Sequence, residues 1–311
     1  MKIISLCIPT NGIVEWVFPV LDSIYNQNVN ESLFEVIVTD NGDNKKFNKL
    51  MTDYALKHKN LIYRKTKAFM FYNQLEALKL AKGEYLKFIN HRSPLVEGSL
   101  LKLIETIKKY SDTKPVIYFS NKALEKDFYS LKTFDEFVKT LRRFCSWTTG
   151  VGIWKEDYKR IPSDAKIDKI SPHSFILFSE RKKDLYIVDN VRFCREIETD
   201  HSKKGKYDLF KAFGVEEPVI ALNLYIDGDI SSKTFKYIKN DYKKFLCELY
   251  YDFKIRKISC SYDLNGFNDA MGIFYKKSDI IKGAYFICFK NLLGLPVRVL
   301  KKLVKLLLRK K

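Results

Sequence analysis

Glycine and proline are scarce in this chain, which has 13 glycines and 8 prolines among 311 residues. It contains no internal repeat, no Gly/Ser-rich linker and no low-complexity tract, so a loosely tethered multidomain protein is excluded. Six cysteines are scattered without CxxC or CxxH spacing and mostly stand among apolar neighbours. Such cysteines are typical of small buried side chains in a reducing compartment, and they exclude a disulfide framework and a zinc finger.

Long apolar runs are also missing, because no stretch of about 18 uncharged apolar residues occurs. The amino end, MKIISLCIPT, passes into a polar segment after too few apolar residues for a signal peptide. We therefore expect a cytoplasmic protein that neither crosses a membrane nor is exported by that route. No GxGxxG and no GxxxxGK[ST] follows any predicted strand, which argues against a dinucleotide oxidoreductase and a P-loop enzyme.

Positive charge is what the chain has in excess, with 56 Lys and Arg against 37 Asp and Glu and a net charge of +19. This excess indicates a polyanionic partner: nucleic acid, phospholipid or a phosphorylated substrate. Part of it is concentrated at the carboxyl end, where eight basic residues and no acid occur from Lys290 onward.

The first third of the chain alternates continuous apolar segments with amphipathic ones, as in a mostly parallel sheet covered by helices. Strands are predicted at 3–8, 34–40, 61–64, 85–90 and 116–120, and helices near 14–26, 45–58, 70–81 and 97–110. Ligands bind at the carboxyl ends of such strands. The loops predicted there are PTNG at 9–12, DNGDN at 40–44 and NHRS at 90–93.

Three of these segments, IPT with Asn11, VTDNGDN and NQLEALKLAKGEYLKFIN, resemble in order and spacing the motifs of the inverting GT-A glycosyltransferases of family two. The resemblance implies an α/β, Rossmann-like GT-A domain with a helical C-terminal extension. It covers 3–110 well and 145–215 weakly. The implied domains are 1–225, with a nucleotide-binding half at 1–110 and an acceptor half at 111–225, and an extension at 226–311.

The resemblance implies a nucleotide-sugar donor, most readily a UDP-sugar, and a glycan or lipid-linked acceptor in bacterial surface polysaccharide synthesis, such as lipopolysaccharide or capsule. The residues that it places around the donor are Pro9, Thr10, Asn11, Asp40, Asn41, Asn73, Asn90 and His91. A buried Asp40 carboxylate suits hydrogen-bond donors of the nucleoside. Turn formation by Asp40-Asn41-Gly42 and helix capping by Asn73 are the structural alternatives.

The sequence departs from the family where strand four normally ends in an acidic DxD motif that holds Mg²⁺ or Mn²⁺. Here the residues are Asn90-His91-Arg92-Ser93. Arg92 is suited to neutralise a diphosphate directly, and His91 offers one metal ligand without a carboxylate beside it. Dependence on a metal is therefore left open, and a catalytically inactive GT-A-like binding module is the alternative function.

In the second half, Trp147, Thr149 and Gly150 resemble the acceptor loop of the family. His173 stands where the family places its catalytic Asp, and imidazole can accept a proton from a hydroxyl. A structural role for His173 is the alternative reading, and Asp168 and Asp164 are the next candidates for the base. His201 corresponds to a late metal ligand of some relatives. The lysines beside it predict a solvated or phosphate-facing loop: Lys203, Lys204 and Lys206.

The segment after Pro296 predicts a basic amphipathic helix. Five basic residues fall within an arc of roughly 100°, and valines and leucines occupy the opposite side. The basic residues are Arg298, Lys301, Lys302, Lys305 and Arg309. Such a helix lies on an anionic membrane, so we expect a peripheral protein at the inner face of the cell membrane that does not bind nucleic acid. A helix packed in the core is the alternative.

Overall fold

A computed structural model describes residues 2–197 and 205–308, with side chains as far as Leu293. The chain packs as two compact units. The first comprises Met1–Glu198 and Gly228–Thr234, and the second comprises Thr199–Asp227 and Phe235–Lys311. Division of the chain into functional domains between residues 225 and 226 stays a prediction.

The main sheet of the first unit has five strands in the order β3-β2-β1-β4-β7, of which only β7 is antiparallel to its neighbour. Its strands are β1 (Ile4–Thr10), β2 (Phe34–Asp40), β3 (Leu61–Lys65), β4 (Tyr85–Phe88) and β7 (Gly152–Trp154). Every residue of β2 and β4 is buried, which explains why these strands are continuous apolar runs rather than alternating ones. The predicted, mostly parallel sheet is confirmed.

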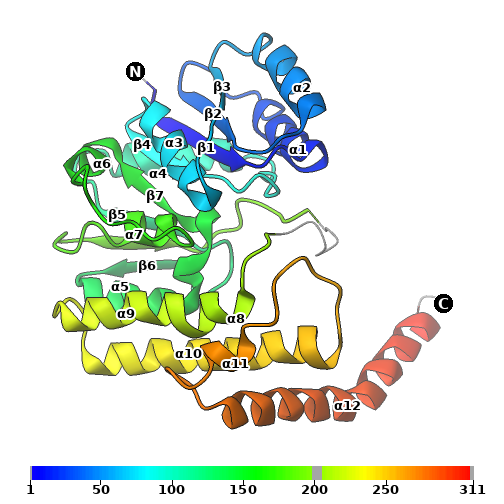
Figure 1. Ribbon diagram of the computed structural model, residues 1–311. Helices are drawn as coiled ribbons and strands as arrows, with labels where there is room; N and C mark the ends of the chain where they lie inside the picture. Colours follow the sequence, from blue (N-terminus) through cyan, green and yellow to red (C-terminus); the bar gives the residue numbers. More distant parts are fainter. Residues whose placement is uncertain (1, 198–204, 309–311) are drawn as a thin grey trace. The chain divides into compact units, whose positions relative to one another are not determined.

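Helices connect these strands as the periodicity predicts. They are α1 (Val14–Tyr25), α2 (Lys45–Ala55), α3 (Asn73–Leu80) and α4 (Ser99–Lys109). Figure 1 shows α1 and α2 on one side of β1–β3 and α3 on the other. Right-handed crossovers require this arrangement, because the chain moves outward from β1 to β3 and then returns across the sheet to β4.

The predicted strand at 116–120 does not join the main sheet. It forms β5 (Val116–Phe119) of a three-stranded sheet in the order β5-β8-β6, with β8 at Tyr186–Asp189 and β6 at Phe128–Leu131. Strand β7 lies beside β4 instead. Its Gly152 packs against the Tyr85 ring, because a Cβ on Gly152 would stand 2.4 Å from Cε1 of Tyr85. The first unit also contains the helices α5 (Phe134–Leu141), α6 (Lys155–Arg160) and α7 (Pro172–Leu177).

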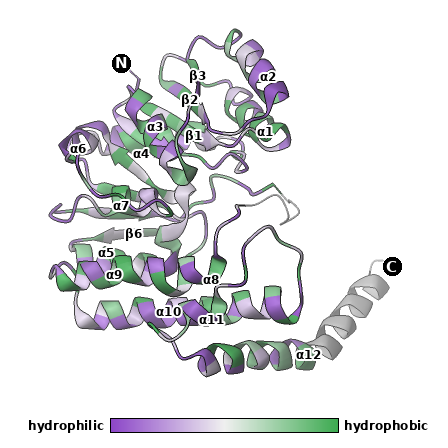
Figure 2. Cartoon of the chain, viewed as in Figure 1, coloured by the Kyte–Doolittle hydropathy of each residue, from purple (hydrophilic) through white to green (hydrophobic). Residues whose placement is uncertain are grey.

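The second unit is helical. It contains α8 (Leu209–Lys211), α9 (Glu217–Ile226), most of α10 (Ser232–Tyr250), α11 (Phe267–Ala270) and α12 (Lys277–Leu308), with π-helical turns at Ala212–Glu216 and Tyr251–Ile255. Tyr242 is buried here and donates its hydroxyl to Glu217 at 3.0 Å. Both hydrophobic and hydrophilic residues occur along α10 (Figure 2), and its buried residues Ile238, Tyr242, Leu246 and Leu249 are three or four positions apart, as expected of a helix with one packed face.

The helix predicted after Pro296 is present as far as Leu308, but it is the end of the longer α12, which begins at Lys277. Residues 309–311 lie outside the described part. Among the described residues, no helix is both long enough and apolar enough to cross a membrane.

Candidate functional site

The carboxyl ends of β1, β2 and β4 bring most of the predicted donor-site residues together. The chain order reverses between β1 and β4, which are neighbours in the sheet, and such a switch point is where open α/β sheets bind ligands. Thr10 ends β1, and its Oγ1 lies 2.8 Å from Nδ1 of His91, just beyond β4. A direct contact therefore joins the two sides of the switch point. Asn11, the next residue after β1, is exposed there.

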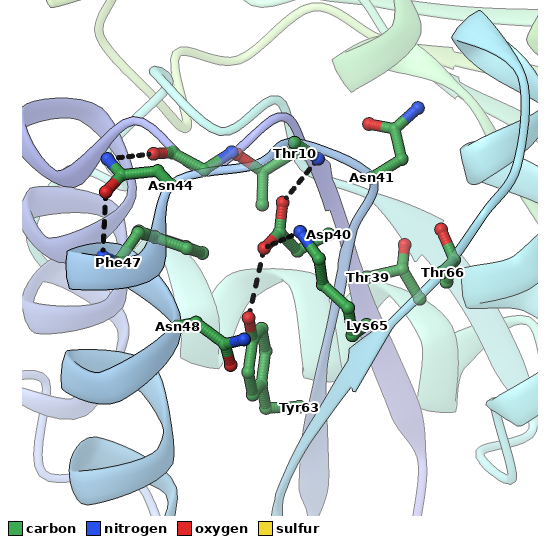
Figure 3. A network of polar contacts seen from close by, with 12 residues as sticks. Thr10, Thr39, Asp40, Asn41, Asn44, Phe47, Asn48, Tyr63, Lys65 and Thr66 are labelled. Carbon is green, nitrogen blue, oxygen red and sulfur yellow. Dashed lines mark hydrogen bonds and ion pairs between the residues drawn. The ribbon is translucent and has the colours of Figure 1, made fainter.

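Asp40 ends β2, and its carboxylate is fully buried in a network within the protein (Figure 3). Oδ1 accepts a hydrogen bond from the Gly42 amide at 2.8 Å. Oδ2 accepts from the Tyr63 hydroxyl at 3.0 Å and from the Lys65 ammonium at 3.1 Å. Lys65 is 40% exposed, so its ammonium lies between the carboxylate and the solvent. The carboxylate thus stabilises the Asp40-Asn41-Gly42 turn, as the structural alternative predicted. Its role in donor binding stays a prediction.

Two asparagines hold the strand ends in place. The Asn73 amide, at the start of α3, donates to the Thr10 carbonyl at 3.1 Å and to the Thr39 carbonyl at 2.8 Å. Asn73 is only 3% exposed and clamps β1 to β2, so it does not cap α3, and its contact with a donor stays a prediction. The Asn41 side chain donates to the carbonyls of Ala68 and Met70, which fixes the chain leading to α3.

The turn after β4 carries His91, whose ring packs edge-on against Trp16 at 5.0 Å. Burial, and then the charge of Arg92, lower the pKa of His91 from its ordinary value of 6.5 to about 3. The imidazole is therefore neutral at physiological pH. Asn90 shapes the same turn. Its side-chain Oδ1 accepts a hydrogen bond from the backbone amide of Arg92 at 3.2 Å, and its backbone amide donates to Thr149 Oγ1 at 3.1 Å.

Glu196 supplies a carboxylate at this turn that sequence reasoning missed. Its Oε2 lies 3.2 Å from Nε of Arg92, and its Oε1 accepts from the Ser93 hydroxyl at 2.6 Å. Backbone hydrogen bonds bring it there, since the amide of Ile197 donates to the Arg92 carbonyl at 2.9 Å. Glu196 is more than a hundred positions away from the turn in sequence, and no local pattern marks the contact.

These side chains do not suit a divalent cation. Within residues 2–197 and 205–308, no three His, Cys, Asp or Glu side chains gather as a metal site requires. The Glu196 carboxylate at this turn is already bound to Arg92 and Ser93. Mg²⁺ and Mn²⁺ prefer several free carboxylate oxygens, which the residues of this turn do not offer.

The predicted acceptor loop packs directly behind the turn. Thr149 is fully buried, and its hydroxyl accepts from the Asn90 amide. Gly150 is required by Tyr118, because a Cβ would stand 2.2 Å from Cζ of that ring. This packing alone is enough to require the glycine. Trp147 packs against Phe193 with ring centroids 6.0 Å apart. Contact of this loop with an acceptor stays a prediction.

Lys87, in β4, is a buried cation beneath this loop that the sequence did not single out. It is fully buried, and its ammonium donates to the carbonyl of Thr149 and lies 4.9 Å from the centre of the Phe119 ring. Burial lowers the pKa of Lys87 from 10.5 to about 7. The side chain ties β4 to the loop that carries Thr149.

The candidate bases occupy α7 and the segment before it. His173 is 5% exposed, and its Nε2 donates to the Ser146 carbonyl at 2.8 Å. Nδ1 then carries the lone pair, and no described residue donates to it. Burial lowers the pKa of His173 from 6.5 to about 4. Asp168 is exposed, and its Oδ1 accepts from the amides of Ile170 and Ser171 at 2.7 and 3.1 Å.

The remaining predicted residues are either exposed or outside the part of the chain that the structure describes. Asp164 and Lys206 are exposed. His201, Lys203 and Lys204 fall in the segment between 197 and 205, outside the described residues. The Tyr72 hydroxyl, just before α3, donates to the Ile167 carbonyl at 2.9 Å. This bond ties the segment of Asp168 to the helix that carries Asn73, so the donor and base candidates share one scaffold.

Comparisons with known proteins agree with this geometry. Residues 5–155 match the family model described as glycosyl transferase family 2. No curated protein sequence matches the chain. The crystal structure of S. aureus TarS 1-349 in complex with UDP-GlcNAc is similar, with a TM-score of 0.55, 16% identity and coverage of 88% of this chain and 80% of that one.

The complex of S. aureus TarS 1-349 with UDP has a TM-score of 0.53 at 16% identity, over 88% of this chain and 76% of that one. The longer TarS structure has a TM-score of 0.54 at 16% identity over 88% of this chain, which spans only 48% of its length. Likeness at this identity establishes the fold. The chain therefore has the GT-A fold that its sequence predicts, and residues 5–155 match glycosyl transferase family 2.

Proposed function

We propose that this protein is a glycosyltransferase that moves a sugar from a nucleotide-sugar donor to a glycan or lipid-linked acceptor. The observation that carries this proposal is the gathering of Thr10, Asp40 and His91 at the carboxyl ends of adjacent parallel strands, on the switch point of a GT-A fold. The match of residues 5–155 to glycosyl transferase family 2 supports it.

The donor in this proposal is a UDP-sugar. TarS, which shares the fold, was crystallised with UDP-GlcNAc and with UDP. Exposed Asn11 and the partly exposed Lys65 stand at the ends of β1 and β3, where a nucleoside reaches them first. Lys65 also lies on the Asp40 carboxylate, so a nucleoside that binds Asp40 must displace the ammonium or bind beside it.

Transfer in this proposal is a direct, inverting displacement, in which an acceptor hydroxyl attacks the anomeric carbon as the nucleoside diphosphate leaves. Arg92 stabilises the charge that develops on the diphosphate. Its Nε is held by Glu196, which orients the guanidinium, and its Cζ lies over the Trp16 ring at 5.9 Å. Its other N–H groups have no hydrogen-bond partner among the described residues. The fork of these groups matches phosphate oxygens in a bidentate manner.

The proposed base that takes the hydroxyl proton is His173, and Asp168 is the second candidate. The bond from Nε2 to the Ser146 carbonyl fixes the tautomer of His173 and leaves Nδ1 as the acceptor of the proton. With a pKa of about 4, the imidazole keeps this lone pair free throughout the neutral range. Asp168 has the advantage of exposure, since an acceptor reaches its carboxylate without any rearrangement.

The proposed location is the inner face of the cell membrane, where lipid-linked precursors of bacterial surface polysaccharides are assembled. Helix α12 supports this proposal, because its inner side packs through buried Ile280 and Ala284 while its opposite side exposes large apolar side chains. These are Tyr285, Phe286, Phe289, Leu292 and Leu293, each 58–68% exposed. An exposed apolar helix face beside a tail without acids suits an anionic bilayer surface.

Incubation with UDP-, GDP-, CDP- and dTDP-sugars, followed by measurement of nucleoside diphosphate release, tests the proposal. We expect release from one nucleotide class, faster with a lipid-linked acceptor. His173→Ala should reduce turnover by about 10²-fold or more, the scale for a lost general base, without changing nucleotide affinity. Asp168→Asn is the matched variant for the second base. Nucleotide binding without turnover under any condition would instead identify an inactive binding module.

A further inference from the structure

A hollow of about 260 Å³ lies in the first unit, apart from the candidate donor site. It is bordered by one face of α4 and by the carboxyl ends of β5 and β8, at Phe119 and Asp189. These two strands are parallel neighbours in the smaller sheet. The carboxyl ends of parallel strands are the usual ligand-binding edge of α/β sheets, and none of the predicted site residues borders this hollow.

Three cations line the hollow without an ion-pair partner. They are Lys102 and Lys109, two turns apart on α4, and Arg192, which follows β8. Among the described residues, none of the three is bound to a carboxylate, and the Lys109 ammonium lies only over the Tyr110 ring at 5.2 Å. All three side chains are exposed. Three positive charges on one hollow favour an anion, although Lys102 is also attracted by the Asp189 carboxylate, and guanidinium and ammonium groups both suit phosphate.

The other lining groups exclude a bare anion as the best ligand. Glu105 and Asp189 also border the hollow, and carboxylates repel a phosphate but accept hydrogen bonds from sugar hydroxyls. Asp189 is held in place because its Oδ1 accepts from the Val191 amide at 3.0 Å. Leu103 and Phe193 add apolar surface against which the C–H face of a sugar ring can pack. Phosphate, hydroxyl and apolar contacts together describe a phosphorylated sugar.

The size and rigidity of the hollow agree with such a ligand. Its volume is just below the range of about 300–1,000 Å³ for drug-sized ligands, so it holds one small molecule or one unit of a polymer. The wall formed by residues 191–193 is fixed by bonds from the Phe193 and Cys194 amides to Asn121 Oδ1, at 2.9 and 3.1 Å. A preformed wall reduces the ordering cost of binding.

We propose that this hollow is a second ligand site, which binds a sugar phosphate through Lys102, Lys109 and Arg192. The ligand is either a free sugar phosphate or one unit of a phosphodiester-linked glycan, since both present the same chemistry. This site is independent of the proposed transferase activity, because it shares no residue with the donor site.

Calorimetric titration with glucose 1-phosphate, in the presence of UDP to fill the donor site, tests the proposal. Glucose and inorganic phosphate are the partial ligands, and a phosphodiester-linked oligosaccharide is the polymeric probe. The test variant is Lys102→Glu/Arg192→Glu, whose altered side chains are exposed. Lys108→Glu is the matched control, because Lys108 is exposed on the same helix and does not border the hollow.

We expect a sugar-phosphate probe to bind the wild type and the Lys108 variant equally, and the double variant at least about tenfold more weakly, the scale for losing one charged hydrogen bond. Glucose and phosphate alone should bind more weakly than the intact probe. Tighter binding of the oligosaccharide than of glucose 1-phosphate identifies the polymer as the source. Equal affinity in both variants, or no binding of either sugar-phosphate probe at millimolar concentration, overturns the proposal. Thermal unfolding of each variant verifies that it is folded.

Discussion

The Asp40 carboxylate is stabilised by its own protein before any ligand arrives, since Gly42, Tyr63 and Lys65 all donate to it. In the proposed donor site, orienting this carboxylate costs nothing further on binding, but the Lys65 ammonium must move or share it. Removal of the Asp40 carboxylate also leaves these three donors without their acceptor. Variants of Asp40 and of its partners therefore distinguish support of the turn from nucleotide binding.

Replacing Asp40 with Ala should weaken UDP affinity by roughly 1.5–3 kcal/mol, the scale for a hydrogen bond to a charged group. Tyr63→Phe is the control, because it removes one partner of the carboxylate and leaves the carboxylate itself. Its UDP affinity should stay close to that of the wild type. Calorimetry on folded proteins measures both values. An unchanged affinity in the Asp40 variant removes this residue from the donor site.

Lys87 predicts a pH dependence of stability. Burial lowers its pKa from 10.5 to about 7 in the folded protein, so between about pH 7 and pH 10 the unfolded chain binds more protons than the folded one. Stability from this group therefore rises with pH in that interval, by at most about 1.4 kcal/mol per pH unit. Below pH 7 Lys87 is protonated in both the folded and the unfolded protein, so burial of its charge lowers the stability by a constant amount.

Lys87→Met should remove this slope, because methionine fills a similar volume without a titrating group. Urea unfolding of wild type and variant at pH 7, 8 and 9 should show the wild type gaining stability relative to the variant as pH rises. Lys82→Met is the control at an exposed position. Parallel curves for the wild type and the Lys87 variant would show that the ammonium is solvated in the folded protein.

At the scale of elements, the strands and helices of the first third were predictable because each has its own period and its own turn residues. The membership of β5 in a separate sheet was not, because β5 pairs with β8 about seventy positions later. The donor-site loops follow from the ends of predicted strands, whereas Glu196 reaches the turn after β4 only through tertiary contacts. The sequence therefore predicts the loops of the candidate site at the strand ends, but not the partners that packing brings to them.

The turn after β4 gives a prediction about metal. Because its side chains do not suit a divalent cation, turnover should persist in EDTA. Arg92→Ala should lose activity by about 10²-fold, as when one group that stabilises the leaving charge is removed. His91→Ala should lose less, and Glu196→Gln should remain within severalfold of the wild type, because it releases the guanidinium without removing it. Complete inhibition by EDTA that Mn²⁺ reverses would contradict this assignment.

For the whole molecule, the proposed membrane surface is weighed against two observations, the net charge of +19 and the exposed apolar face of α12. Nucleic acid accounts for the charge but not for exposed Phe286 and Phe289. A helix packed in the core stays the alternative for the segment after Pro296, whereas the α12 face from Tyr285 to Leu293 is exposed. An anionic bilayer accounts for both, since basic residues bind its surface and aromatic side chains enter its interface.

If α12 binds the membrane, deleting 296–311 should release the protein from anionic vesicles and leave the turnover of a soluble acceptor analogue nearly intact. Lys301→Glu/Lys302→Glu/Lys305→Glu should act similarly, because attraction becomes repulsion, and Phe286→Ser/Phe289→Ser should weaken binding through the apolar face alone. Lys233→Glu/Lys236→Glu/Lys244→Glu, which makes the same charge change on α10, is the control and should bind anionic vesicles more tightly than the triple Lys→Glu variant of the tail.

Vesicle binding should fall with added salt, since screening at physiological ionic strength acts over about 8 Å. Flotation with anionic and neutral vesicles, beside DNA binding at matched salt, measures these differences. Equal flotation of the wild type, the deletion and both α12 variants would show that the helix does not attach the protein to membranes, and DNA binding that follows the same series would identify nucleic acid as the partner instead.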